Sequence, residues 1–326
     1  MIVSRTPLRI SFVGGGSDFR DFYQKHSGAV VSAAINKYIY VMVNRRPDGL
    51  IRVSYSKAEY VKSVDEVEHD IIREALKLVG IENSIDITYL GDVSISISGT
   101  GLSSSSALAV GVLNALYCFK NKKVSPEKLA REACRIEIDI LGRPIGKQDQ
   151  YAVAYGGLNY IQFNADESVR VEPIRLEKKL KSRLNNNLLL LNTGLATQSS
   201  IVLQEQKSKI QDNQELLMSV KELAGLVKNN LNKGKINLLG NFLHQNWLAK
   251  KQFASLISNN KIDQYYETAL QAGASGGKIL GSGGGGFLLF YCASEKNKKQ
   301  VRKALTDLQE MPFQFANKGS LIVYRD

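Results

Sequence analysis

The chain has 326 residues, of which 44% are hydrophobic and 23% charged, a composition typical of globular proteins, and this length favours two domains over one. The 43 lysine and arginine residues outnumber the 31 acidic residues, for a net charge of +12. They are spread along the chain, which fits a solvated surface or a polyanionic small ligand and argues against nucleic acid as a partner. No apolar run reaches the roughly 18 residues of a membrane span, and Arg5 and Arg9 interrupt the N-terminus where a signal peptide is apolar.

The first half of the chain alternates short β-type runs with glycine-rich turns and helical patterns. A short helix is expected between the first two strands. Two longer helices are expected at 103–119 and 126–141, the second capped by Ser125 before Pro126. The segment 55–67 is interpreted as the start of a surface helix, with part of an adenine pocket as the alternative. Strands are predicted at 2–14, 28–46, 51–55, 85–90, 93–98, 156–163 and 169–176.

The second half is predicted to be mainly helical. A polar stretch at 178–187 indicates a domain boundary, and a buried strand follows at 188–194. Helices are expected from Gln198 to Leu270, with breaks at 232–235 and 258–261. A strand, a glycine loop and an apolar strand then occupy 278–294, followed by an exposed helix at 295–303. We therefore predict an α+β chain with domains at 1–182 and 183–326.

The cysteines and histidines give no sign of a metal site or a disulfide framework. Cys118, Cys134 and Cys292 are far apart, and with three scattered histidines they show no zinc spacing. Reduced thiols are the simplest interpretation, and they predict a cytoplasmic protein.

The segment GTGLSSSSA (99–107) has the composition of a phosphate-binding loop. Glycines allow close approach to an anion, and serines at a helix start add hydroxyl donors to free backbone N–H groups. One serine oxygen could instead bind Mg²⁺. A plain capping loop is the alternative, but it needs one serine rather than four. The P-loop is excluded because no lysine is present, and the dinucleotide fingerprint fits poorly.

Two other glycine loops lie next to ionisable groups or strands. Gly14–Gly16 precede Asp18, whose carboxylate could accept hydrogen bonds from sugar hydroxyls, and Arg9 shares a strand face with Ser11. Gly281–Gly286 carry more glycines than a hairpin needs, which predicts close packing against another loop or a ligand. On their own, Asp149 and Glu137 are typical of a helix cap and a helix face.

Together, TPLRISFVGGGSD, GTGLSSSSA and KILGSGGGGF, in this order and with GKQDQYAVAYGGLN between the last two, resemble the motifs of the GHMP small-molecule kinases. The resemblance covers nearly the whole chain. It implies ATP and Mg²⁺ as cofactors, an N-terminal domain with a left-handed βαβ crossover and a ferredoxin-like C-terminal domain. Within the family, the chain is most similar to the branch that phosphorylates the anomeric hydroxyl of D-glycero-D-manno-heptose 7-phosphate for surface polysaccharide synthesis. A small-molecule partner in a cytoplasmic monomer or homodimer is expected.

The resemblance also implies roles for single residues. Asp149 matches the catalytic base and Arg9 the basic group near the reacting hydroxyl, while Lys147 or Arg9 is expected beside the carboxylate. Ser105 and Glu137 match the magnesium ligands. The expected nucleotide-phosphate ligands are Gly99, Gly101, Leu102, Ser103, Ser104, Ser105 and Ser106. The expected substrate-side residues are Asp18, Gly15, Gly16, Gly283 and Gly284.

One departure from the family pattern concerns specificity. Gly15 and Gly16 stand where galactokinases have a Glu-His pair, so the loop is more open and could admit a larger sugar. A fucose, galactose or mevalonate kinase remains an alternative within the family, and a catalytically silent nucleotide-binding relative an alternative outside enzymes. The presence of Arg9, Ser105, Glu137 and Asp149 argues against the silent relative.

Overall fold

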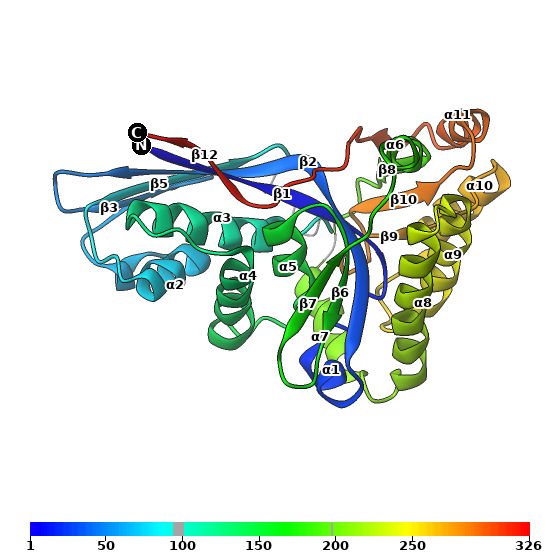
Figure 1. The fold of residues 1–326 in the computed structure, drawn as a ribbon, viewed down its shortest axis with the longest axis horizontal. Helices are drawn as coiled ribbons and strands as arrows, with labels where there is room; N and C mark the ends of the chain where they lie inside the picture. The colour runs from blue at the N-terminus through cyan, green and yellow to red at the C-terminus, as the bar shows by residue number, and fades with distance from the viewer. Residues whose placement is uncertain (94–100, 197) are drawn as a thin grey trace.

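The computed structural model describes residues 1–93, 101–196 and 198–326, and its described strands form two sheets (Figure 1). The first sheet holds β1 (Ile2–Val13), β2 (Gly28–Arg45), β3 (Ile51–Ser54), β4 (Ala58–Val61), β5 (Ile85–Gly91), β6 (Leu158–Phe163), β7 (Val169–Pro173) and β12 (Leu321–Arg325). The second holds β8 (Leu188–Asn192), β9 (Gly276–Ile279), β10 (Phe287–Tyr291) and β11 (Gln309–Glu310).

The described helices lie between and beyond these strands along the chain. Their bounds are α1 (Arg20–His26), α2 (Asp70–Val79), α3 (Ser104–Phe119), α4 (Pro126–Cys134), α5 (Gln148–Tyr155), α6 (Lys178–Asn186), α7 (Ser199–Ser208), α8 (Gln214–Asn232), α9 (Leu239–Lys250), α10 (Asn260–Gln271) and α11 (Glu295–Ala304).

The long strand β2 organises the first sheet. It pairs with β1 along most of its length, with β6 through residues 28–33 and with β5 through residues 39–45. The main path of the sheet runs β12-β1-β2-β5-β3-β4. Among the described strands, β3 and β5 are the one parallel pair, and the chain travels between them through β4 and α2.

Helix α3 is the central helix of the first half and packs beneath the sheet beside α2 and α4 (Figure 1). Nearly all of its side chains are buried, so it lacks the polar face of a surface helix. Gly111 allows its close approach to β1, because a Cβ there would lie 2.9 Å from the Thr6 hydroxyl oxygen. The Ser4 hydroxyl donates to the Gly111 carbonyl at 2.8 Å. These contacts fix the axis of α3, which begins within the four consecutive serines Ser103–Ser106, here called the serine quartet.

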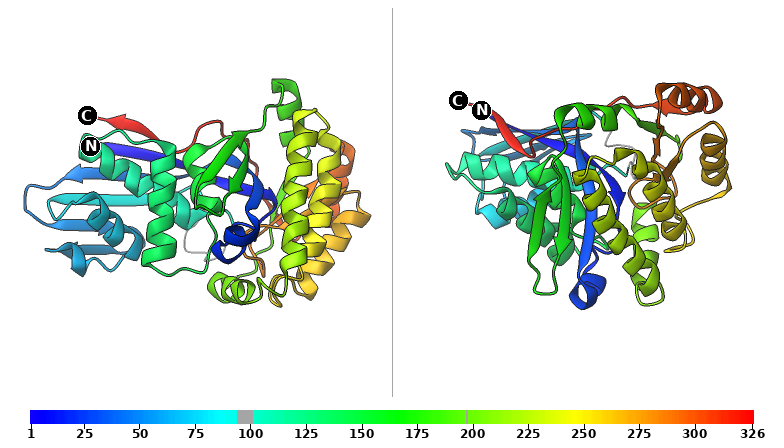
Figure 2. Two further views of the ribbon diagram at one scale, coloured as in Figure 1. Left: turned by 60° about the horizontal axis from the view of Figure 1, so that its bottom comes forward. Right: turned by 45° about the vertical axis from the view of Figure 1, so that its right-hand side comes forward.

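The second sheet confirms the ferredoxin-like prediction. Its order is β11-β8-β10-β9, every pair is antiparallel, and helices separate β8 from β9 and β10 from β11. All five residues of β10 are buried, which explains its continuous apolar sequence. Helices α9 and α10 pack against β9, and α8 lies beside α9 and packs against β2 of the first sheet (Figure 2).

The final strand returns to the first sheet. β12 pairs antiparallel with β1, and the amino group of Met1 lies 2.8 Å from a carboxylate oxygen of Asp326. Both chain ends therefore lie at the edge of the first sheet, far from the second (Figure 1). The division at residues 182 and 183 stays a prediction.

Most predicted elements are confirmed, and the exceptions are local. The stretch 178–187, expected as a polar boundary, is largely the helix α6. The segment 55–67 holds the strand β4 and a short 3₁₀ turn instead of a helix start. The helix at 126–141 changes to π-helical geometry at Arg135–Ile140. Most of the strand expected at 93–98 lies outside the described residues.

The sequence predicts reduced cysteines and no membrane-spanning segment, and both expectations can be compared with the described residues. Cys118, Cys134 and Cys292 are all buried free thiols. Within the described ranges, every helix is too short or too polar to cross a bilayer.

Candidate active site

The serine quartet lies at the start of α3, as predicted. Ser103 precedes the helix with a left-handed backbone (φ 65°), and α3 begins at Ser104. The first N–H groups of a helix lack partners within it and carry partial positive charge, so this end of α3 can hold an anion. Ser103–Ser106 line a cavity of about 450 Å³, a volume within the range of small-molecule sites. We call this space the larger cavity.

The residues just before the quartet serve in different ways. Gly101 lines the larger cavity. The Leu102 side chain is fully buried in the core, and its carbonyl accepts the backbone N–H of Arg9 at 3.2 Å. Leu102 therefore anchors the loop to β1. Gly99, the other predicted glycine, lies outside the described residues.

The loop that contains Gly101 and the third glycine loop, Gly281–Gly286, cross with their backbones in contact. A Cβ at Gly281 would lie 2.3 Å from the Cα of Gly101, and a Cβ at Gly101 would lie 2.7 Å from the Leu280 carbonyl oxygen. Both glycines have positive φ values, 74° at Gly101 and 63° at Gly281. Only glycine fits both the contact and the backbone conformation. The expectation that the third loop packs against another loop is confirmed.

Gly283 and Gly284 lie deeper in the third loop than expected. Neither lines the larger cavity or the smaller one described below. A Cβ at Gly283 would lie 2.7 Å from the Ile257 carbonyl oxygen, and the Gly284 N–H donates to that oxygen at 2.9 Å. They shape the loop, whereas Gly281 and Ser282 contact the cavities.

Glu137 lies inside the π-helical turn and is fully buried. The Ser105 hydroxyl donates to its Oε1, and the Gln150 amide donates to its Oε2 at 2.7 Å. Arg143 donates to the same Oε1 at 3.1 Å and to the Ser105 oxygen at 2.9 Å. Burial raises the pKa of Glu137, while these hydrogen bonds and the Arg143 charge oppose the increase. π-Helical segments within α-helices are frequent at functional sites. This one directs the Glu137 carboxylate toward residues 101–106, which we call the serine loop.

The direct contact of Ser105 with Glu137 fits a magnesium site. Mg²⁺ prefers oxygen ligands and is usually held by one or two carboxylates together with substrate phosphates. Here one carboxylate and one hydroxyl meet beside the start of α3. Among the described residues there is no cluster of three or more metal-ligating side chains, so any metal here would depend on ligand oxygens.

Arg9 and Asp149 form the most complete charged contact of the site. Arg9 projects from β1, and its Nε and Nη2 donate to the two oxygens of Asp149, each at 2.8 Å. Its Nη1 donates to the Gly101 carbonyl at 2.6 Å. The Arg9 side chain is 4% exposed and that of Asp149 is 26% exposed. Because Asp149 lies in the first turn of α5, the helix dipole favours its negative charge.

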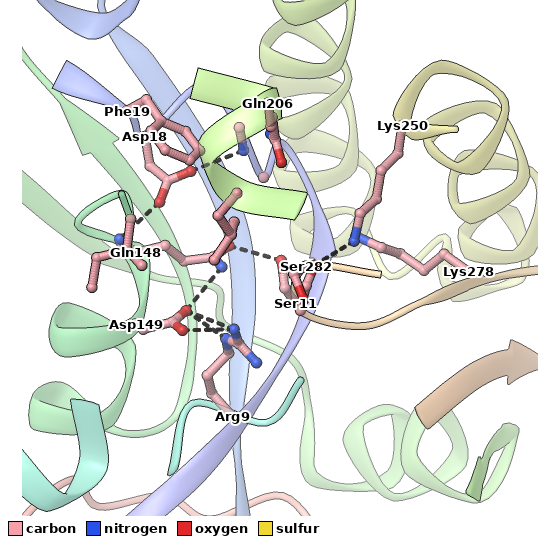
Figure 3. A pocket seen from close by; sticks show the side chains of 15 residues that line it. Arg9, Ser11, Asp18, Phe19, Gln148, Asp149, Gln206, Lys250, Lys278 and Ser282 are labelled. Carbon is pink, nitrogen blue, oxygen red and sulfur yellow. Dashed lines mark hydrogen bonds and ion pairs between the residues drawn. The ribbon is translucent and has the colours of Figure 1, made fainter. Parts of the chain in front are cut away.

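A second cavity, of about 100 Å³, adjoins the larger one (Figure 3). We call it the smaller cavity. It is lined by three of the residues predicted for the substrate side, Gly15, Gly16 and Asp18, and that role stays a prediction. Arg9 and Asp149 line both cavities. The Asp18 oxygens accept the backbone N–H of Gly16 at 2.9 Å and of Gln148 at 3.1 Å. Burial raises the pKa of Asp18, and these two bonds counter the effect.

The open loop at Gly15 and Gly16 also has a packing requirement. A Cβ at Gly16 would lie 2.8 Å from the Gln206 amide nitrogen, and φ is 102° there, whereas a Cβ at Gly15 would meet only the Ser11 oxygen at 3.8 Å. The Ser11 hydroxyl donates to the Gln148 side chain at 2.7 Å. The first glycine loop is thus held from both sides while Gly15 stays open to the cavity.

The sequence did not single out three basic residues of the site. Arg143 links Ser105, Glu137 and, at 2.9 Å, Asp70. Lys250 and Lys278 line the smaller cavity from the second half of the chain. In the sequence, Arg143 stands out only as a basic residue in the Gly-Pro turn after the Glu137 helix.

Lys147, one of the two cations expected beside Asp149, points elsewhere. Its ammonium group pairs with Glu167 and lies 4.7 Å from the centre of the Tyr23 ring. Arg9 is therefore the cation that contacts Asp149.

Part of the lining of the larger cavity is aromatic and apolar. His69, Ile71, Tyr89 and Leu108 contribute to it. The Tyr89 ring stacks on Tyr55 with centroids 5.8 Å apart, which stiffens this wall. The cavity therefore combines an anion-binding end with a surface that can pack against a planar ring.

Comparison with known families gives two matches in the order of the chain. The family model described as GHMP kinases N terminal domain matches residues 56–157, which include the start of α3, Glu137 and Asp149. The family model described as GHMP kinases C terminal matches residues 227–309, which include Lys250 and the third glycine loop.

Similar proteins extend this likeness over the full length. The chain is 29% identical over 336 residues to a D-glycero-alpha-D-manno-heptose 7-phosphate kinase from Campylobacter jejuni, with 96% of each chain covered. A crystal structure of a D-glycero-D-manno-heptose 1-phosphate kinase from Bacteroides thetaiotaomicron superposes with a TM-score of 0.82 at 26% identity, covering all of both chains. Lactococcus lactis galactokinase, at 18% identity and a TM-score of 0.76 over 98% of this chain and 94% of that one, shares the fold.

Proposed function

Because the chain belongs to the GHMP kinase family, we propose that it transfers the γ-phosphoryl group of ATP to the anomeric C1 hydroxyl of D-glycero-D-manno-heptose 7-phosphate. The proposal includes Mg²⁺ as the metal, a cytoplasmic location, and a role in making nucleotide-activated heptose for surface polysaccharides.

The observation that carries this proposal is that Arg9 and Asp149 border both cavities. A phosphoryl donor and an acceptor alcohol must meet in line, and a group that takes the alcohol's proton must touch the acceptor. With a nucleotide in the larger cavity and a sugar in the smaller, the two substrates would meet at Asp149.

Asp149 would act as the general base. Its Oδ1 accepts hydrogen bonds from Arg9 and, at 3.2 Å, from the Gln148 side chain, whereas its Oδ2 accepts from Arg9 alone among the described residues. Oδ2 therefore has the freer lone pair, and we assign it the proton of the sugar hydroxyl. Arg9 fixes the plane of the carboxylate through two parallel bonds, a geometry that lysine cannot supply.

The serine loop would hold the triphosphate. The N–H groups at the start of α3, where the helix dipole carries partial positive charge, and the hydroxyls of Ser103–Ser106 would donate to phosphate oxygens. Ser105 and Glu137 would hold Mg²⁺, which when bound neutralises charge that develops on the transferred group. His69 and Tyr89 would pack against the base. Asp18 would accept hydrogen bonds from sugar hydroxyls on the other side.

The test is a substrate panel with an ADP-release assay and NMR of the product. The panel contains heptose 7-phosphate, unphosphorylated heptose, fucose, galactose and mevalonate. Heptose 7-phosphate should give the highest kcat/KM, and its new phosphate should be on C1. Faster turnover of another panel member, or a new phosphate on a different carbon, would exclude the assignment. Absence of ADP release with every acceptor, alongside normal Mg·ATP binding, would favour a silent nucleotide-binding relative.

A further inference from the structure

Lys250 and Lys278 are two buried lysines that the mechanism above does not use. Lys250 is the last residue of α9 and is 7% exposed, and Lys278 lies in β9 and is 2% exposed. Lysine is rarely buried unless it is paired. Both residues line the smaller cavity, where Figure 3 shows their ammonium groups converging on the side away from Asp149.

The partners of these ammonium groups are backbone carbonyls. Lys250 donates to Ile279 at 3.2 Å and to Gly281 at 2.5 Å, and Lys278 donates to Phe12 at 3.1 Å. An ammonium group has three N–H donors, so one remains at Lys250 and two at Lys278. Across residues 1–93, 101–196 and 198–326, no carboxylate oxygen lies within 4.0 Å of either nitrogen.

The other charges of the smaller cavity are already matched. Asp149 is paired with Arg9 through two bonds, and Asp18 accepts two backbone N–H groups. Among the described residues, therefore, no carboxylate within ion-pair distance balances a positive charge on either lysine. Burial and the Arg9 charge lower the pKa of Lys250 to about 7, with Asp149 opposing the decrease. Burial, Lys250 and Arg9 lower the pKa of Lys278 well below its usual value, with Asp18 opposing the decrease.

Unbalanced cations on a cavity wall are costly to the folded protein alone, and an anion in the cavity removes the cost. A ligand with a hydroxyl at Asp149 and a dianionic group at the lysines would satisfy both ends of the smaller cavity. We propose that Lys250 and Lys278 form the subsite that binds the phosphate group already present on the sugar phosphate. This proposal rests on the proposed function and names the residues that would select a phosphorylated sugar.

A purely structural role makes a different prediction. If the lysines only tie β9 and the third glycine loop to neighbouring carbonyls, their loss would affect stability without changing the choice between phosphorylated and unphosphorylated sugar. The informative quantity is therefore the ratio of kcat/KM for heptose 7-phosphate to that for heptose.

The variants are Lys250→Met and Lys278→Met, which keep an unbranched apolar stem and remove the ammonium group. Lys298→Met is the matched control, because Lys298 is also a buried lysine that donates to a carbonyl, that of Asn186 at 2.9 Å, but it lies in α11 and outside both cavities. Loss of one charge-assisted hydrogen bond predicts a fall of roughly 10- to 100-fold in the ratio for each site variant. The control should keep the parent ratio.

A second measurement does not depend on turnover. With Mg·ADP saturating the nucleotide site, inorganic phosphate should raise the melting temperature of the parent and of Lys298→Met, and this shift should be lost in both site variants. If the phosphate shift is present in the parent and lost in the site variants, but the parent does not phosphorylate heptose 7-phosphate, the subsite is supported and the proposed substrate is excluded. A parent enzyme with equal kcat/KM for both sugars, or site variants that keep both the ratio and the phosphate shift, would exclude the subsite.

Discussion

The replacement of Asp149 by asparagine tests the reaction and the local energetics together. Arg9 is 4% exposed and directs two of its N–H groups at the Asp149 oxygens. Asparagine offers one oxygen and one NH₂ group, so an amide donor would face a guanidinium donor. Breaking a buried ion pair by removing one partner costs about 3–5 kcal/mol. Because 26% of the Asp149 side chain is exposed, we expect the lower end, about 3 kcal/mol.

The kinetic effect should be larger than the effect on folding. Loss of a positioned general base costs about 10²- to 10⁴-fold in kcat. The affinity for Mg·ADP should change little, because the serine loop and Glu137 are intact. Turnover is measured by ADP release, nucleotide affinity by calorimetry and the free energy of unfolding by urea titration. The control is Asp48→Asn, which removes an exposed ion pair with Arg46 and should have little effect on the free energy of unfolding and none on kcat.

The double variant Arg9→Met with Asp149→Asn separates the two effects. Removing both charges leaves no unpaired guanidinium, so much of the lost stability should return, while turnover stays lost. A single Asp149→Asn variant with kcat within about tenfold of the parent would refute the assignment of the base. A double variant less stable than the single one would refute the argument from the unpaired charge.

Three further variants test other parts of the site. Gly281→Ala would place a Cβ 2.3 Å from the Cα of Gly101. We expect the free energy of unfolding to fall by at least about 1–3 kcal/mol and Mg·ADP binding to weaken. Parent-like values of both quantities would contradict the close contact between the two loops. Glu137→Gln should reduce the affinity for Mg²⁺ measured with ADP while metal-free ADP binding persists, and equal metal dependence in parent and variant would remove Glu137 as a ligand. Lys250→Met should be more stable than the parent below pH 7, where the parent lysine is charged in both the folded and unfolded states. Its advantage should shrink as the pH rises from the folded pKa of about 7 to the ordinary value of 10.5, because only the unfolded state then binds the proton. Burial and the Arg9 charge lower this pKa and Asp149 opposes the decrease, so a stability difference independent of pH would contradict the burial argument.

The sequence predicts the parts of the fold and site that depend on local patterns. The strands at 2–13 and 28–45 follow from runs of β-branched residues, and α3 follows from a serine cap before an apolar stretch. Asp149 and Glu137 are identified only through their order among three glycine motifs, since each alone is typical of a helix cap or a helix face.

The features that the sequence does not predict depend on contacts between distant segments. Residues 131–141 have the composition of an ordinary helix, and the π-helical turn becomes apparent only with Glu137 buried against Ser105. The pairing of β12 with β1 joins the two ends of the chain, a contact that no local pattern indicates. Lys250 and Lys278 are two among 43 basic residues, and nothing local distinguishes them from surface lysines.

The net positive charge of the chain becomes informative only when the positions of the individual basic residues are known. Two unit charges 4 Å apart repel by about 4 kcal/mol at an effective dielectric constant of 20, so an enzyme that brings a triphosphate to a sugar phosphate must separate or neutralise the two anions. With the substrates placed as proposed, these cations would meet the requirement: Arg143 contacts Ser105, Arg9 lines both cavities, and Lys250 and Lys278 line the smaller cavity. A net charge of +12 alone does not distinguish this arrangement from a basic surface. The difference lies in Lys250 and Lys278, which are buried at a cost that a solvated lysine does not incur.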